Sequence, residues 1–326
     1  MMRNPMNKAK CYKAGLPILV MALMCSAHVQ AQEDERGGDQ EETPIQTLVS
    51  GLSFHITAGA EYNSNVSVNE LDVNAGNSDV AAKLSAQVKF EQEFGKGTEF
   101  DIRYKLSTTT HSEFSRFDIL THLVSTKIEH DFDGFKAGVS YQFADSRLNQ
   151  TDFLTLNQIS PYASMYFGKK TYIRGFYGYA DKAFEGSPGR DSQVNKGGAD
   201  AYYFLDGVRQ YVQGGYSYED NDAQAAEFDY RAHKFKLRYA KRVDFLGRQA
   251  KLKAGWRYEI RDYESVTPSI GAIRDDDRHR FQLEAELPIT DVFYGQIEFE
   301  HAIYSSNLPS ADYNRSIVAV SLGAEF

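Results

Sequence analysis

Hydrophobic and polar residues alternate along most of the chain, and this alternation predicts β-strands. Near the end of the chain, Val318, Val320 and Leu322 alternate with small or polar residues. Successive side chains of a strand point to opposite faces, so one face of such a segment is apolar and the other is polar. The same alternation recurs, often with fully charged residues on the polar face, in segments 84–91, 100–107, 135–143, 235–239, 252–260, 281–287 and 293–303.

Short turns and longer polar loops alternate between these segments. Turns are predicted at 95–97, 131–134, 168–170, 205–207, 244–247 and 288–291, and longer loops near 66–78, 111–118, 146–151, 185–195, 220–226, 263–277 and 305–312. These connections separate about 14 strands. Bacterial transmembrane barrels have tight periplasmic turns, longer outer loops and an even strand number.

The fold class predicted by this pattern is all-β, an up-and-down antiparallel transmembrane β-barrel spanning residues 50–326. The soluble alternative is a β-sandwich, which buries its apolar face between two sheets and needs no second, densely charged inward face. The alternating strands recur about every twenty residues, which also favours strands long enough to cross a membrane.

The first 49 residues differ from the rest. Residues 3–13 are basic, 14–27 are apolar, and a small-residue site precedes Gln32, so residues 1–31 are predicted to be a secretory signal peptide cleaved after Ala31. An uncleaved anchor is the alternative, but the apolar run is shorter than a bilayer requires. Residues 32–49 are predicted to be a solvated acidic tail in the periplasm.

Composition and charge narrow the function. The formal net charge is -9, and the predicted signal peptide contains four basic and no acidic residues, so the mature chain is more acidic still. This balance excludes a nucleic-acid partner. Both cysteines, Cys11 and Cys25, lie in the signal peptide, which leaves the mature chain without a thiol.

If the apolar positions face lipid, the charged positions of four late strands face the lumen. The lumen wall then has a basic half beside an acidic half. We interpret this arrangement either as cross-strand pairing that rigidifies a narrow barrel or as a transverse field in a pore that orients charged solutes. The lumen-facing candidates are Lys234, Lys236, Arg238, Arg242, Lys251, Lys253, Arg257, Arg261, Arg280, Glu284, Glu286, Glu298 and Glu300.

Catalytic and metal-binding signals are weak, so we predict no enzyme, no metal and no cofactor. The adjacent His111 and Ser112 lack an acid at a recognisable spacing. The run Asp275-Asp276-Asp277 contains calcium-type ligands, but an isolated acidic run in a loop is usually solvated.

Two short motifs carry a family resemblance. They are Tyr62-Asn63-Ser64-Asn65 at the end of the first strand and Tyr313-Asn314-Arg315 at the start of the last. With the strand count, they resemble the barrel of the surface lipoprotein assembly modifier family, which implies movement of lipoproteins or soluble proteins to the bacterial surface. Members usually carry a helical tetratricopeptide domain before the barrel, whereas this chain has the acidic tail there, so a separate periplasmic partner could supply that part.

The terminal Phe326 resembles the C-terminal signature that the barrel-insertion machinery of the outer membrane reads. We therefore expect a bacterial outer-membrane protein whose partners are outer-membrane lipid, that machinery and a secreted protein or lipoprotein client. The leading hypothesis is a translocation path. The alternatives are a passive porin-like channel for small charged solutes or oligosaccharides and, less favoured, a lipid-modifying enzyme; the oligomeric state is left open.

Overall fold

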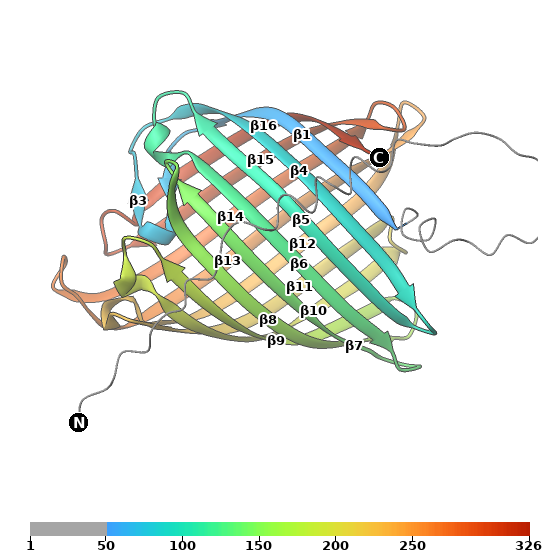
Figure 1. Ribbon diagram of the computed structural model, residues 1–326, viewed down its shortest axis with the longest axis horizontal. Coiled ribbons are helices and arrows are strands. Elements are labelled where there is room, and N and C mark those ends of the chain that lie inside the picture. Colours follow the sequence, from blue (N-terminus) through green and yellow to red (C-terminus); the bar gives the residue numbers. More distant parts are fainter. Residues whose placement is uncertain (1–50) are drawn as a thin grey trace, which may run out of the picture. The chain divides into compact units, whose positions relative to one another are not determined.

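The alternating segments pair with their chain neighbours and close into a ring. The computed structural model describes residues 51–326, in which fourteen antiparallel strands form a closed barrel (Figure 1). This confirms the predicted fold class and strand number. The predicted signal peptide (1–31) and acidic tail (32–49) lie outside the described residues.

The barrel strands follow one another around the ring in chain order. They are β1 (Leu52–Asn63), β4 (Asp79–Phe94), β5 (Thr98–His111), β6 (Ile119–Asp131), β7 (Lys136–Leu148), β8 (Thr151–Phe167), β9 (Thr171–Phe184), β10 (Ser192–Asp206), β11 (Gln210–Ala223), β12 (Tyr230–Phe245), β13 (Arg248–Thr267), β14 (Ala272–Pro288), β15 (Phe293–Ser306) and β16 (Tyr313–Glu325). A small hairpin of β2 (Ser67–Val68) and β3 (Val73–Asn74) and four short 3-10 helices, η2 (Asn69–Leu71), η3 (Ser115–Phe117), η4 (Pro188–Arg190) and η5 (Ala226–Phe228), lie in the connections. None of the helices in residues 51–326 has the length and apolarity needed to cross a bilayer.

Two predicted loops are wrong. The expected loop 263–277 is mostly strand, because β13 extends to Thr267 and β14 begins at Ala272. The expected loop 146–151 shrinks to Asn149 and Gln150, both with positive φ. In both places, charged residues belong to the polar face of a strand, so their charge was a poor indicator of a loop.

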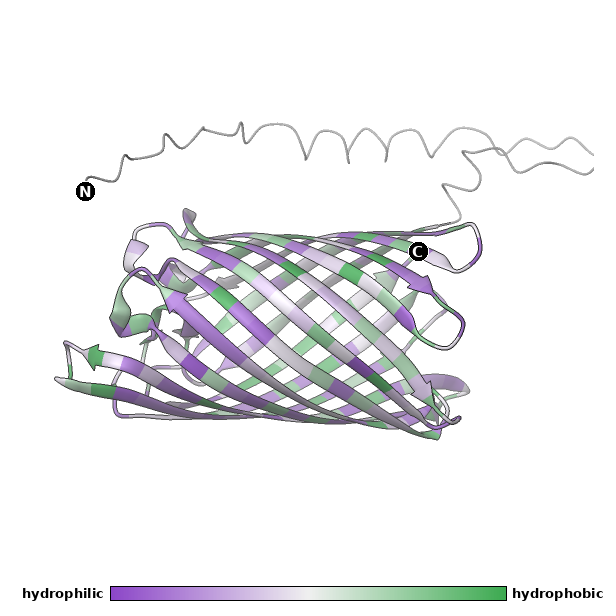
Figure 2. Cartoon of the chain, turned by 90° about the horizontal axis from the view of Figure 1, so that it is seen from below, coloured by the Kyte–Doolittle hydropathy of each residue, from purple (hydrophilic) through white to green (hydrophobic). Residues whose placement is uncertain are grey.

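The outer face of the barrel is apolar. Phe281, Leu283 and Val320 are each 43% or more exposed, while the charged residues between them point the other way. The alternation of apolar and polar residues along each strand is visible in Figure 2. A barrel that spans a bilayer needs such an apolar band because lipid offers no hydrogen-bond partners.

The seam between the first and last strands is closed by the end of the chain. β1 pairs with β16, and Phe54 and Phe326 exchange two backbone hydrogen bonds of 3.0 Å. The Phe326 side chain is 65% exposed. We call the end of the barrel where β1 begins and β16 finishes the short-turn end, and the opposite end, which contains the hairpin β2–β3, the loop end (Figure 1).

Candidate functional site

The connection between β1 and β4, residues 64–78, crosses the mouth of the barrel at the loop end; we call it L1. Its Val68 packs with Phe153 of β8, and its Asn69 reaches Tyr304 of β15. In the ring of fourteen strands, β8 and β15 are seven positions apart and therefore lie on opposite walls. L1 thus spans the lumen from wall to wall.

Asparagine side chains shape the base of L1. Asn63 Oδ1 accepts a hydrogen bond from the Asn65 backbone N at 3.1 Å, and Asn65 Oδ1 accepts one from the Gly76 backbone N at 3.0 Å. Gly76 has a φ of 66°, a conformation that favours glycine. Side-chain hydrogen bonds of this kind fix turns locally. The two asparagines of the first motif therefore set the path of L1.

One side of L1 is held by an apolar cluster. Val66 and Val68 are buried against three aromatic rings, those of Phe117, Phe153 and Phe184. L1 was expected to be a polar loop, and this expectation is wrong for its valines. Burying a valine side chain contributes about 1.5–3 kcal/mol, so this cluster is a substantial anchor.

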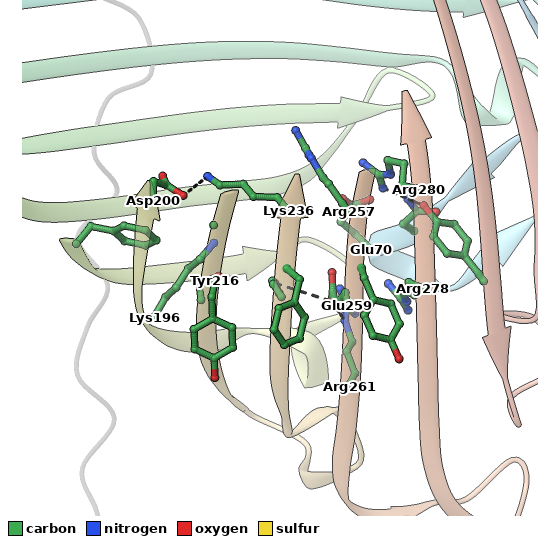
Figure 3. A pocket seen from close by; sticks show the side chains of 18 residues that line it. Glu70, Lys196, Asp200, Tyr216, Lys236, Arg257, Glu259, Arg261, Arg278 and Arg280 are labelled. Carbon is green, nitrogen blue, oxygen red and sulfur yellow. Dashed lines mark hydrogen bonds and ion pairs between the residues drawn. The ribbon is translucent and has the colours of Figure 1, made fainter. Parts of the chain in front are cut away.

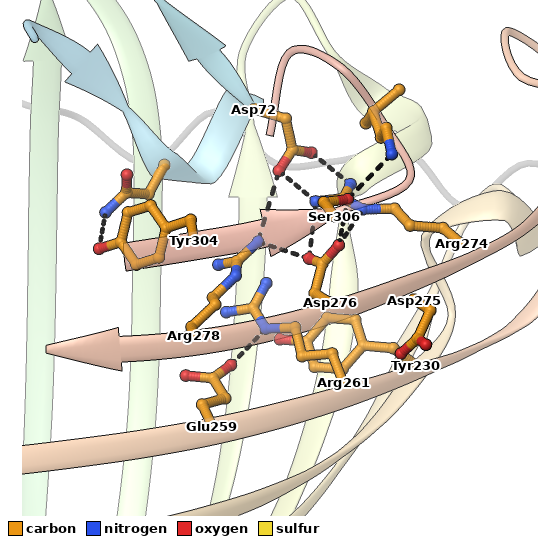
Figure 4. A network of polar contacts seen from close by, with 12 residues as sticks. Asp72, Tyr230, Glu259, Arg261, Arg274, Asp275, Asp276, Arg278, Tyr304 and Ser306 are labelled. Carbon is orange, nitrogen blue, oxygen red and sulfur yellow. Dashed lines mark hydrogen bonds and ion pairs between the residues drawn. The ribbon is translucent and has the colours of Figure 1, made fainter. Parts of the chain in front are cut away.

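The other side of L1 is held by a buried ionic network (Figure 4). Asp72 accepts hydrogen bonds from Arg274 Nη1 and Nη2 at 2.9 and 2.8 Å and from Arg190 Nη2 at 2.9 Å. Arg274 also contacts Asp276, which in turn accepts from Arg278 at 2.7 Å. Arg274 is 2% exposed and Asp276 is 0% exposed. The network is therefore shielded from solvent and its charges are matched by close partners.

The protonation of Asp72 follows from this setting. Burial raises the pKa of its carboxyl, but the hydrogen bonds and charges of Arg274 and Arg190 outweigh burial and hold the pKa well below its usual range. Asp72 is therefore ionised at any pH near neutral, and L1 is docked as an anion among arginines.

The second family-like motif also holds L1. The Tyr313 hydroxyl donates to Asn69 Oδ1, and Arg315 donates to Ser67 Oγ at 3.0 Å and to Glu300 Oε1 at 2.7 Å. Tyr62 and Asn314 instead lie exposed on the outer face. Asn63, Asn65, Tyr313 and Arg315 therefore share one structural task, the placement of L1.

Beneath L1, cavities of about 460, 250 and 260 Å³ lie among the described residues of the lumen wall. The largest of these three, which we call the upper cavity, is bounded by Asn69 and Glu70 of L1 and by strands β9 to β15 (Figure 3). Arg257 also lines the second cavity, and Phe176, Lys196, Lys234 and Arg261 also line the third, so the three adjoin. Seven basic and three acidic residues line the upper cavity, which gives it a positive charge within an acidic protein.

Most of the lumen-facing candidates form ion pairs. Lys251 with Glu286 and Lys253 with Glu284 form rungs of 2.6 Å between β13 and β14. The remaining pairs join Lys234 to Glu219 at 2.8 Å, Lys236 to Asp200 at 2.7 Å, Lys83 to Glu298 at 3.4 Å, Arg280 to Glu300 at 3.8 Å, and Arg261 to Glu259. The pairs of Lys234, Lys251, Lys253 and Arg280 join neighbouring strands, whereas those of Lys236 and Lys83 reach past at least one intervening strand and that of Arg261 lies within β13.

Three candidates lack an ion pair among the described residues: Arg238, Arg242 and Arg257. Arg242 is exposed beside the short turns, and its backbone N donates a hydrogen bond to Arg209 O at 2.7 Å. Arg238 and Arg257 line the second cavity, and Arg257 also lines the upper one. Arg257 lies directly opposite Lys236 on one side and Arg280 on the other. The lumen wall thus contains a row of adjacent cations with an unpaired arginine at its centre.

The network around Asp72 was missed in the sequence. Asp276 was expected in a solvated acidic loop, and that expectation is wrong because the residue lies in β14 beneath two arginines. Within residues 51–326, no cluster of three metal-type ligands occurs. Arg274, Asp276 and Arg278 are spaced two residues apart, so their period-two spacing was a usable signal of one inward face.

A Ser–His contact does occur on the outer face. His301 Nδ1 lies 2.8 Å from Ser316 Oγ on the neighbouring strand. His111 instead contacts Asp118 at 3.3 Å. In the described part of the chain, no carboxylate contacts His301, and a hydrolytic triad needs such a group to orient its histidine. The pair is therefore a cross-strand hydrogen bond and gives little support to a lipid-modifying enzyme.

Fold and lumen together define a transmembrane β-barrel of the outer-membrane type. No family model and no curated protein matches the sequence. Among solved structures, the chain is similar to OmpT, an outer membrane protein of Vibrio cholerae, in its trimer form, with 10% identity, a TM-score of 0.51, and coverage of 84% of this chain and 99% of that one. Outer-membrane expressed OmpT of Vibrio cholerae gives a TM-score of 0.50 at 10% identity, with coverage of 84% of this chain and 97% of that one. An anion-selective porin from Comamonas acidovorans gives a TM-score of 0.49 at 11% identity, with coverage of 84% of this chain and 98% of that one. At these identities the likeness concerns the fold alone.

Proposed function

We propose that this protein is an outer-membrane channel for small anionic solutes whose outer mouth is closed by L1. The observation that carries the proposal is the row of cations formed by Lys236, Arg257 and Arg280. Cross-strand neighbours lie about 5 Å apart, and like charges in such positions are destabilising. Lys236 and Arg280 have acidic partners, but Arg257 has none within ion-pair distance among the described residues. An anion passing through the cavity would supply the missing charge.

L1 supplies the second part of the proposal. Its Asn69 and Glu70 bound the upper cavity, and its two anchors hold opposite walls. Solutes would pass when L1 is released from one anchor. If the short turns face the periplasm, as in other bacterial barrels, L1 closes the outer side.

Planar-bilayer recording of the purified protein tests this function. Asn63 and Asp79 are register partners, so a short Asn-Gly turn can replace residues 64–78 without disturbing β1 or β4. We expect small, rare currents from the native protein and large, steady, anion-selective currents from the variant without L1. A properly folded variant that stays silent, or one that prefers cations, would contradict the proposal.

A second candidate is a translocation path for a lipoprotein or secreted protein, supported by the resemblance of the two L1-placing motifs to those of the assembly modifiers. Cavities of this size cannot hold a folded domain, so such a client would have to pass as an extended chain after L1 leaves. Deletion of the gene tests this candidate: unchanged surface lipoproteins and unchanged secreted proteins would exclude it.

A further inference from the structure

Five aromatic side chains gather at the short-turn end of β8 to β11. They are Tyr166, Tyr172, Tyr202, Phe204 and Tyr211, and we call them the aromatic patch. Register pairing places Tyr172 beside both Tyr166 and Tyr202, and Phe204 beside Tyr211. The patch therefore extends across four neighbouring strands.

The patch faces the lumen. Along β10, Tyr202 shares its face with Lys196 and Asp200, which line the upper cavity. The intervening Tyr203 points outward and is 48% exposed. Along β9, Tyr172 shares its face with Phe176, another residue of that cavity. Because alternate side chains of a strand lie on one face, these rings are inside the barrel.

The rings form an open surface, unlike those packed in a core. Neighbouring centroids lie 5.0 Å apart for Tyr166 and Tyr172, 5.7 Å for Tyr172 and Tyr202, and 6.0 Å for Tyr202 and Tyr211. Tyr166 is 59% exposed, and the other four rings are partly exposed. Tyrosine offers an apolar ring face together with a hydroxyl that can donate and accept hydrogen bonds.

A cation without an ion pair continues the patch towards the upper cavity. Arg174 lies on β9 between Tyr172 and Phe176 on the same face, with its guanidinium 3.8 Å from the centroid of the Tyr162 ring. Its Nε is buried and has no hydrogen-bond partner. Arg174 makes no ion pair with any acid of residues 51–326, so its charge is available to a ligand in the lumen.

We propose that the aromatic patch and Arg174 form a binding site for an acidic oligosaccharide at the short-turn end of the lumen. The negative face of an aromatic ring attracts the weakly positive C–H groups of a pyranose, and arginine binds carboxylates through paired hydrogen bonds. Beyond Arg174, the cationic row provides further sites for carboxylates. This site rests on the proposed channel, because a chain bound there has to continue through the lumen.

The extent of the patch favours a chain of sugars over a single aromatic acid. One flat ligand ring needs one or two protein rings, whereas these five extend over four strands. Adjacent strands lie about 4.8 Å apart, so the patch is long enough for several sugar units in succession. We therefore expect affinity to increase with the number of sugar units.

Titration calorimetry of the full-length protein in detergent tests the site, with hexagalacturonate as the probe. We compare it with galacturonate monomer and with neutral maltohexaose. We expect hexagalacturonate to bind much more tightly than either. Equal binding of monomer and hexamer, equal binding of maltohexaose, or no binding of hexagalacturonate would each overturn the proposal.

Variants assign the binding to the patch. Tyr202→Ala should weaken hexagalacturonate binding by about tenfold, the effect of losing one stacking contact. Tyr202→Leu keeps most of the apolar volume and so controls for misfolding of the alanine variant. Arg174→Gln should reduce the preference for acidic over neutral chains, with the cationic row providing the remainder. Tyr203→Ala, on the outer face of the same strand, is the matched control and should bind normally. Native affinity in both Tyr202 variants would overturn the proposal.

Bilayer currents separate this proposal from the channel itself. Binding of hexagalacturonate by a protein that never conducts would keep the site and reject the channel. Conduction without binding would keep the channel and reject the site.

Discussion

Replacing Asp72 by asparagine should release L1 from the wall formed by β14. Asp72 is 7% exposed and accepts three hydrogen bonds of 2.8–2.9 Å from Arg274 and Arg190. Asparagine occupies nearly the same space and retains one oxygen acceptor, but it has no charge. The substitution therefore removes the ionic anchor and leaves the valine cluster of L1 intact.

The size of the effect follows from burial. Removing one partner of a buried ion pair costs about 3–5 kcal/mol, because the remaining charge is left uncompensated. Asp276 still accompanies Arg274 in the variant, so we take the lower end, about 3 kcal/mol. This value corresponds to a change of roughly 150-fold in the ratio of docked to released L1.

Two measurements check this prediction. In planar bilayers, Asp72→Asn should show a much greater open probability than the native protein. Endoproteinase Glu-C should cleave after Glu70 much faster, because in docked L1 the Glu70 carbonyl is held by a hydrogen bond of 3.0 Å from Arg190 Nη1. Asp222→Asn is the matched control, an exposed acid of β11 with no contact to L1. If Asp72→Asn gated and resisted proteolysis like the native protein, the ionic anchor would not be what closes the mouth.

Three further predictions concern pH, selectivity and assembly. Because the pKa of Asp72 is depressed in the docked state, the stabilisation of L1 by Asp72 is complete above the ordinary aspartate pKa and is lost as pH falls towards the depressed pKa. Bilayer currents should therefore be unchanged from pH 7 to pH 5 and should increase only below about pH 4. The double variant Arg238→Gln and Arg257→Gln should shift the reversal potential in a salt gradient towards lower anion preference, and an unchanged potential would exclude these two unpaired arginines as the selectivity element. Deletion of Phe326 removes the two hydrogen bonds to Phe54 and the terminal aromatic, so it should lower the yield of folded barrel in membranes, measured by heat-modifiable gel mobility; a native yield would contradict both roles.

The strands could be predicted because lipid and lumen impose opposite chemistry on alternate positions. Phe281 and Leu283 face outward while Glu284 and Glu286 pair with lysines of β13, and the sequence shows this division directly. The same rule failed at Asp275 to Asp277, where three adjacent acids hide the alternation. There the inward Asp276 is neutralised by arginines two residues away on each side, a pairing that only the period-two spacing of Arg274 and Arg278 indicated.

The candidate site was only partly predictable. The inward direction of charged residues such as Lys234 and Glu300 follows from the alternation of side chains along a strand. Which of these charges form ion pairs depends on distances across several strands, which the sequence does not contain. L1 was hidden for a different reason. The aromatic partners of Val66 and Val68 lie more than forty residues away in the sequence. The period-two alternation within a strand contains no information about such distant contacts.

The docking of L1 also orders the assembly of the barrel. L1 follows the first strand, yet its partners Arg190, Arg274 and Arg315 come from the later part of the chain, with sequence separations of 118, 202 and 248 residues in their hydrogen bonds to it. Contacts of such high sequence separation form late, after the intervening chain has been placed. A partly inserted barrel therefore has an unsealed mouth, and only a chain that has inserted its last strand can become tight to solutes. The residues that close the mouth can therefore make their contacts with L1 only in a completed barrel.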